Sequence, residues 1–132
     1  MRSMSLLLAT VGLAACSTAP EVRSPRAEAH LQEMLEGKIA QQAVDCLPGI
    51  RSNDMVVIDD NTILFREGRK VYRNDLNGGS CNGLGGGHYA LLTRQHGRLC
   101  RGDIGEVKDL TSGMTVGSCV MGDFVPYVPA SS

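Results

Sequence analysis

The fold is decided by residues 55–66, Met55-Val56-Val57-Ile58-Asp59-Asp60-Asn61-Thr62-Ile63-Leu64-Phe65-Arg66, in which two apolar runs flank a short polar turn. Both runs are rich in β-branched residues, which favour the extended backbone of strands. Asp-Asp-Asn is typical of a turn, because short polar side chains hydrogen-bond the local backbone. A second turn at residues 67–69 leads into Lys70-Val71-Tyr72-Arg73-Asn74. Residues 55–74 therefore predict a three-stranded antiparallel meander.

Glycine dominates the sequence that follows the meander. Six glycines fall within Asn77–Gly87, around Cys81, and predict a loop. Beyond them, His88–Thr93 and Arg98–Arg101 flank Gln95-His96-Gly97 and predict a second hairpin. A further strand is expected at Glu106–Leu110, before an extended segment through Phe124-Val125-Pro126-Tyr127. We predict a mainly β domain over residues 46–128, a small antiparallel barrel or sandwich of about five to seven short strands, with a tail at 129–132.

One helix is expected before this domain, over residues 25–45. Ser24 can cap its N-terminus and Pro25 suits the first helical position. Leu31, Leu35, Ile39 and Ala43 recur every four residues and form one apolar stripe. Gly37 weakens the helix by ~1 kcal/mol relative to alanine. We therefore expect the helix to need the β domain to pack against.

The first 15 residues have the pattern of an export signal. Arg2 precedes an uncharged stretch, Ser3–Ala15, which is too short to span a bilayer permanently. The stretch ends in Leu13-Ala14-Ala15-Cys16, which resembles the lipobox of bacterial lipoproteins. The alternative is an ordinary secretory signal followed by a chance cysteine.

The lipobox resemblance implies a lipid-anchored product. It implies cleavage before Cys16, a diacylglycerol on the Cys16 thiol and a fatty acid such as palmitate on the new amine. Several acyl chains hold a protein on a membrane, whereas one chain binds only marginally. Residues 16–24 would then form the lipidated tether. Ser17, where inner-membrane lipoproteins carry aspartate, favours the periplasmic face of the outer membrane by analogy with enterobacterial sorting.

Four cysteines remain after Cys16 is set aside: Cys46, Cys81, Cys100 and Cys119. An even number in an exported domain predicts two disulfides. Structural zinc is disfavoured, because no two of these cysteines lie within four residues of one another. Three pairings are open, and the nested one, Cys81 to Cys100 and Cys46 to Cys119, is favoured. It would tie the glycine-rich loop to the second hairpin and join the two ends of the domain.

Charge and motifs exclude several function classes. Removal of residues 1–15 leaves 12 basic and 14 acidic side chains, a formal charge of −2, which implies no nucleic-acid partner. Gly83-Leu84-Gly85-Gly86-Gly87 is followed by an apolar segment rather than a helix and carries no Lys-Ser or Lys-Thr pair, so no nucleotide site is expected. No cofactor is predicted.

The polar residues that could carry chemistry form no recognisable catalytic pattern. His30, His88 and His96 have no metal-ligand spacing, so no metal site is predicted. The loop serines Ser80, Ser112 and Ser118 lie outside any Gly-x-Ser-x-Gly motif. Asp59 and Asp60 are neighbours in the predicted turn, and adjacent carboxylates there point in different directions. We therefore predict no catalytic residues.

Four cations, Arg66, Arg69, Lys70 and Arg73, surround the second turn. The favoured interpretation is a solvated hairpin whose charges discourage edge-to-edge pairing. An acidic partner, such as a surface polymer, is the alternative.

The order of residues between Cys46 and Pro126 resembles a family of small exported proteobacterial proteins classified as a domain of unknown function. The motifs that carry the resemblance are Val57–Phe65, Asn74-Asp75-Leu76, Cys81-Asn82-Gly83-Leu84, Leu99–Asp103, Gly117-Ser118-Cys119 and Gly122-Asp123-Phe124. The resemblance implies one compact domain with four recurring cysteines. It implies no activity.

Three functions are consistent with these observations. The leading hypothesis is a non-enzymatic, membrane-tethered envelope module that binds a protein or polymer. The second is a periplasmic inhibitor of a hydrolase such as lysozyme, because Gly86-Gly87-His88-Tyr89 faintly resembles the inhibitory loop of such lipoproteins. The third is an envelope hydrolase, which a serine or carboxylate within reach of His88 or His96 would favour.

Overall fold

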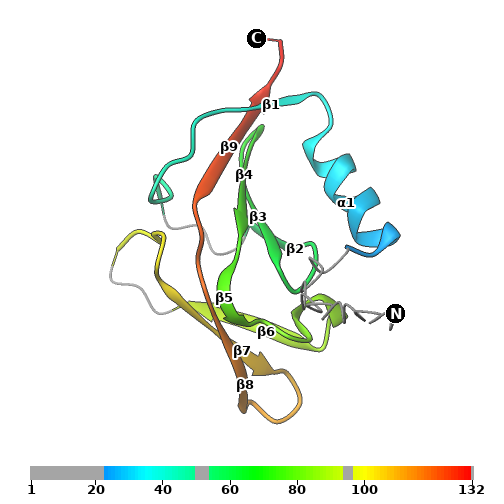
Figure 1. Cartoon of the computed structure of the whole chain (residues 1–132), viewed down its shortest axis with the longest axis vertical. Helices are drawn as coiled ribbons and strands as arrows, with labels where there is room; N and C mark the ends of the chain where they lie inside the picture. Colours follow the sequence, from blue (N-terminus) through cyan, green and yellow to red (C-terminus); the bar gives the residue numbers. More distant parts are fainter. Residues whose placement is uncertain (1–22, 50–53, 94–96, 132) are drawn as a thin grey trace, which may run out of the picture.

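The computed structural model describes residues 23–49, 54–93 and 97–131 (Figure 1). The predicted signal peptide at 1–15, the lipidation site Cys16 and most of the tether at 16–24 lie outside the described residues. His96 and the turn before Gly97 also lie outside them.

The described residues form one helix and two antiparallel sheets. The first sheet has the strand order β1-β9-β4-β3-β2 and the second has the order β5-β8-β7-β6. The bounds are α1 Pro25–Leu35, β1 Lys38–Ala40, β2 Met55–Val57, β3 Thr62–Glu67, β4 Lys70–Asp75, β5 Asn77–Ser80, β6 Tyr89–Thr93, β7 Ile104–Asp109, β8 Thr115–Val120 and β9 Phe124–Pro129. The predicted mainly β class with two disulfides is confirmed, and the arrangement is an open sandwich rather than a closed barrel.

The predicted meander forms the centre of the first sheet. Val56 lies opposite Leu64 in the β2–β3 pair, and Phe65 lies opposite Tyr72 in the β3–β4 pair. Thr62, Ile63, Leu64 and Phe65 are all buried, so both faces of β3 are covered. Because side chains alternate along a strand, Leu64 faces one layer while Ile63 and Phe65 face another.

Two cores cover the two faces of this sheet. On one face, Ala27 and Leu31 of α1 pack with Ile58, Leu64 and Val71. On the other face, side chains of the two sheets pack together in the larger core, which includes Ile63, Phe65, Tyr72, Val107, Met121 and Phe124. The first sheet is therefore covered by α1 on one face and by the second sheet on the other. Figure 1 shows α1 beside the first sheet and the second sheet toward the lower end.

The predicted helix over residues 25–45 is too long. Ser24 caps α1 as expected, its hydroxyl accepting from the Ala27 amide at 3.2 Å, but α1 ends at Leu35. Gly37 adopts a left-handed backbone with φ +69°, which stops the helix. Ile39 then lies in β1 opposite Val128 of β9. The apolar residues spaced four apart in the sequence therefore belong to different elements: Leu31 and Leu35 lie in α1, and Ile39 lies in the edge strand β1.

The predicted second hairpin is also wrong. β6 pairs with β7 and not with Arg98–Arg101, which contains no strand. Residues Asn77–Ser80 of the predicted glycine loop form β5. β8 was not predicted, and the predicted tail at 129–132 is partly structured, because Pro129 lies opposite Lys38 and Ala130 donates a backbone hydrogen bond to Gly37.

The favoured nested disulfide pairing is wrong as well. The bridges are Cys46–Cys100 and Cys81–Cys119, with Cα atoms 3.9 and 5.3 Å apart. Cys46 and Cys100 lie opposite one another in an isolated antiparallel bridge. Cys81 directly follows β5, in which Gly79 lies opposite Cys119 of β8. Since residues 98–101 do not pair with β6, the strand that would have brought Cys100 to Cys81 does not exist.

One buried amide joins the two sheets where the chain passes from β8 to β9. The side chain of Asn74 donates to the Gly122 carbonyl at 2.8 Å and accepts from the Gly122 amide at 2.9 Å. Asn74 is fully buried. A Cβ at position 122 would lie 2.1 Å from the Asp75 carbonyl oxygen, so only glycine fits. The side chain of Asn74 thus supplies the two hydrogen bonds that a neighbouring strand would otherwise make to the backbone of Gly122.

We predict that Asn74→Ala destabilises the domain by about 3 kcal/mol, because it leaves both backbone groups of Gly122 buried without a partner. Chemical denaturation followed by circular dichroism measures the change. The control is Asn61→Ala, which removes an exposed turn side chain and should shift stability by less than ~0.5 kcal/mol. Equal losses in the two variants would contradict the structural role of Asn74.

Candidate functional site

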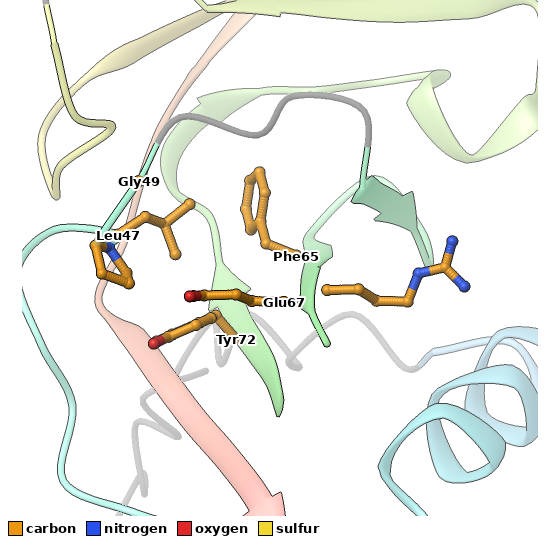
Figure 2. A pocket seen from close by; sticks show the side chains of 7 residues that line it. Leu47, Gly49, Phe65, Glu67 and Tyr72 are labelled. Atoms are coloured by element: carbon orange, nitrogen blue, oxygen red, sulfur yellow. The ribbon is translucent and has the colours of Figure 1, made fainter. Parts of the chain in front are cut away.

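A small hollow opens at one end of the larger core (Figure 2). Its volume is about 200 Å³, and its lining residues are Leu47, Pro48, Gly49, Phe65, Arg66, Glu67 and Tyr72. Figure 2 shows Leu47 and Phe65 facing the hollow, with the oxygen ends of Glu67 and Tyr72 pointing to one side of it. The hollow therefore combines an apolar floor with a polar rim.

Strand register positions the two aromatic residues that form one wall of the hollow, Phe65 and Tyr72. Phe65 and Tyr72 are directly opposite one another in the β3–β4 pair, so their side chains share a face. The Phe65 ring lies 5.8 Å from the Phe124 ring of β9. Lys70 lies over the Tyr72 ring, with its ammonium 5.7 Å from the ring centroid. These contacts hold the aromatic wall in one arrangement.

The opposite wall depends on a disulfide. Leu47 follows Cys46, and its amide donates to the Leu99 carbonyl at 2.9 Å. The Cys46–Cys100 bridge and the hydrogen bond from the Arg101 amide to the Asp45 carbonyl, at 2.6 Å, flank this contact. Leu47 itself is buried. The segment that closes the hollow is thus tied to residues 99–101, more than 50 positions further along the chain.

Neither carboxylate of the predicted Asp59-Asp60 turn is free for acid–base chemistry. Oδ1 of Asp59 accepts from the amides of Asn61 and Thr62, both at 2.8 Å, and Oδ2 accepts from Arg23 at 2.6 Å. Asp60 accepts from the amides of Gly83 at 3.0 Å and Gly85 at 2.8 Å. The turn is a structural connector between α1, the first sheet and the glycine-rich loop.

Arg23 completes this connector, although its sequence position gave no reason to single it out. Its guanidinium donates to Asp59, to the Thr62 hydroxyl at 2.6 Å and to Glu28 at 3.2 Å. Burial lowers the pKa of Arg23, but the hydrogen bonds to Asp59 and Glu28 outweigh it and raise the pKa overall. Hydrogen bonds from Gln32 and then from Arg23 lower the pKa of Glu28. Arg23 is therefore held as a cation against the start of the domain.

The glycine-rich segment is a compact loop. Leu84–Gly86 form a 3₁₀ turn between Gly83 and Gly87, both with left-handed backbones, and Leu84 is buried. The segment leads into strand β6 rather than a helix, as the sequence predicted. A Cβ on Gly83 would lie 2.8 Å from the Tyr89 ring, and Tyr89 packs against the larger core. Gly86, Gly87 and His88 remain exposed, whereas the Tyr89 ring is held against the loop.

The structure does not bring the other chemistry-bearing residues together. His30 is exposed on α1, His88 is exposed after the glycine-rich loop, and no hydrogen bond reaches either ring within the described residues. The Ser112 hydroxyl accepts from the Met114 amide in a turn, and Ser118 is exposed on β8. Within the described ranges no group of three or more His, Cys, Asp or Glu residues could hold a metal ion.

The four cations around the β3–β4 turn do not form one site. Arg73 pairs with Asp75 at 3.1 Å, and Lys70 lies over Tyr72. Arg66 and Arg69 are exposed. Arg66 contributes to the lining of the hollow, but it alternates with Phe65 and Glu67 along β3, so its guanidinium points to the opposite face of the sheet. In the part of the chain that the structure covers, no helix has the length and hydropathy needed to cross a membrane.

We predict that Arg23 and Asp59 are energetically coupled by about 1 kcal/mol in a double-mutant cycle of Arg23→Gln and Asp59→Asn. Asparagine keeps the acceptor that closes the turn and removes only the charge. Thermal or chemical unfolding of the four proteins measures the coupling. The control pair is Arg101→Gln with Asp123→Asn, whose side chains are half exposed and 2.9 Å apart, and which should couple by less than ~0.5 kcal/mol. Additive effects at Arg23 and Asp59 would contradict the prediction.

Comparison of the chain with known protein families, with curated proteins and with solved structures gives no significant match. The resemblance to exported proteobacterial proteins between Cys46 and Pro126 therefore stays a prediction. The fold and the hollow are assigned from the residues of this chain alone.

Proposed function

We propose that the chain is an envelope lipoprotein, anchored through acyl chains on Cys16 to the periplasmic face of the outer membrane, whose domain binds a protein partner without catalysing a reaction. The hollow lined by Leu47, Phe65 and Tyr72 is the observation that carries the binding role. The sequence Leu13-Ala14-Ala15-Cys16 carries the anchor.

The disulfides support a location outside the cytoplasm. All four cysteines of the described domain are paired, in Cys46–Cys100 and Cys81–Cys119. Disulfides persist in oxidising compartments and are rare where thiols are kept reduced. This agrees with an export signal before Cys16, and Cys16 is then the one cysteine left for lipid.

The size of the hollow favours a protein partner over a small molecule. Ligand sites usually enclose about 300–1,000 Å³. A hollow of about 200 Å³ with an aromatic and aliphatic floor suits a single apolar side chain. The Glu67 carboxylate and the Tyr72 hydroxyl provide polar contacts at one side of it (Figure 2), as is typical of the rim of a protein interface. A protein segment that presents one apolar anchor residue is therefore the partner that fits best.

We predict that the wild-type chain pellets with membranes and that Cys16→Ser does not, because serine cannot accept the thioether-linked lipid. Fractionation of cells producing each protein measures the distribution, and mass spectrometry of the wild-type N-terminal peptide measures the acyl mass. Cys16→Ser with residues 1–15 removed, as checked by mass spectrometry, and still found in the membrane pellet to the same extent as wild type would contradict the lipid anchor.

We predict that Gly49→Leu abolishes capture of the partner, because the new side chain grows from the lining of the hollow. The control is Gly86→Leu, in the glycine-rich loop. Both glycines have an ordinary backbone φ and nothing within 4 Å of an added Cβ, so both variants should fold. Crosslinking in intact envelopes followed by mass spectrometry measures capture.

The two leucine variants also separate two modes of binding. Loss of capture in Gly86→Leu with normal capture in Gly49→Leu would contradict binding through the hollow. That result would favour the inhibitor hypothesis, in which residues 86–89 contact the partner, and a lysozyme assay with the purified protein would then test it.

A further inference from the structure

Exposed apolar side chains gather at the turn between β7 and β8. Leu110 is 64% exposed, Met114 is 66% exposed and Val116 is 52% exposed. Three of the seven large hydrophobic residues that are exposed in the described part of the chain therefore lie within residues 110–116, in the turn and at the start of β8. Clustered exposed apolar groups of this kind usually mark a contact surface.

The turn is built to hold these side chains outward. The Asp109 carboxylate accepts from the amides of Thr111 at 2.7 Å and Ser112 at 2.9 Å. The Asp109 amide donates to the Met114 carbonyl at 2.9 Å, and the Gly113 amide donates to the Asp109 carbonyl at 2.8 Å. Hydrogen bonds from the Ser112 and Thr111 amides lower the pKa of Asp109. The one carboxylate of the turn is thus engaged by the backbone.

A continuous chain of hydrogen-bonded residues links this turn to Arg23. The Leu110 amide donates to the His88 carbonyl at 3.1 Å, which joins the turn to the glycine-rich loop. The loop is held by Asp60, and the adjacent Asp59 holds Arg23. Figure 1 shows the β7–β8 hairpin and the glycine-rich loop at one end and the β3–β4 turn with the C-terminus at the other.

The sequence limits the distance between Arg23 and the proposed anchor. Only residues 17–22 separate Cys16 from Arg23. A fully extended chain of this length spans at most about 25 Å. Since Arg23 is bound to Asp59 and Thr62, the Asp59–Asn61 turn is held close to the point where the tether meets the domain.

We propose that the β7–β8 turn inserts Leu110 and Met114 into the lipid surface beside the anchor. This inference rests on the proposed lipidation of Cys16. A bilayer suits the turn because these side chains project from a tip, where they can enter the interfacial region without a complementary cavity. The turn is then a second, weaker membrane contact that fixes which end of the domain faces the lipid.

The test uses tryptophan as a reporter, because the natural chain has none. Leu110→Trp is compared with Ile39→Trp, at a residue 56% exposed on β1 near the opposite end. Both full-length lipidated proteins are reconstituted into vesicles of phosphatidylethanolamine and phosphatidylglycerol that contain brominated acyl chains. We expect a blue-shifted emission and strong quenching for Leu110→Trp, and neither for Ile39→Trp. Met114→Trp should behave as Leu110→Trp does.

The outcomes separate failure of the inference from failure of the anchor. If both reporters pellet with the vesicles and are equally unquenched, the anchor stands and membrane contact by the turn is overturned. If Leu110→Trp is blue-shifted but unquenched by brominated lipid, the turn packs against protein and lipid contact is overturned. If neither variant pellets, the anchor and the inference that rests on it are both overturned.

Discussion

The architecture depends on the hydrogen-bonded pair formed by the Asn74 side chain and the Gly122 backbone. The chain leaves β8 of the second sheet at Val120 and enters β9 of the first sheet at Phe124. A backbone that changes sheets loses its strand partners, and buried polar groups without partners are strongly destabilising. The amide of Asn74 presents one donor and one acceptor to the two groups of Gly122, which satisfies both. Met121 and Phe124 can then be fully buried on either side of the corner.

The two disulfides differ in where they lie relative to this corner. Cys81–Cys119 lies inside the larger core, within the second sheet next to the corner. Cys46–Cys100 lies at the periphery and ties the segment after β1 to the segment before β7. The first bridge reinforces packing that hydrogen bonds already specify. The second bridge positions Leu47, and with it one wall of the hollow. Among the described residues, the segment between β1 and β2 is joined to other segments by two isolated β-bridges, at Val44 and Cys46.

The sequence predicted what is determined locally. The turn at Asp59–Asn61, the three strands around it and the Ser24 cap depend on neighbouring residues, and all are present. The errors concern partners far apart in the chain. Ile39 continues the helical spacing of Leu31 and Leu35, but it pairs with Val128, which no local pattern reveals. β8 contains Gly117 and Ser118, so it lacks the apolar alternation of an isolated strand signal.

The candidate site was beyond sequence reasoning for the same reason. Leu47, Phe65 and Tyr72 come from three segments, and only the last two are related by a predictable hairpin register. Arg23 stood in the predicted tether, and its role appears only when Asp59 and Thr62 are brought to the start of α1. A signal was available in hindsight, because a cation directly before a helix cap and a carboxylate pair in a turn are complementary charges.

Different groups gather at the two ends of β3. Thr62, at the start of the strand, contacts Arg23, whereas Phe65 and Glu67, at its end, line the hollow. Strands rise about 3.3 Å per residue, so the ends of this six-residue strand are separated by roughly 17 Å. Because β3 is buried on both faces, this separation is fixed by the rigid centre of the fold. The proposed tether leaves from Arg23 and would therefore direct the hollow away from its point of attachment, as an anchored protein requires if it is to reach a partner beyond the membrane surface.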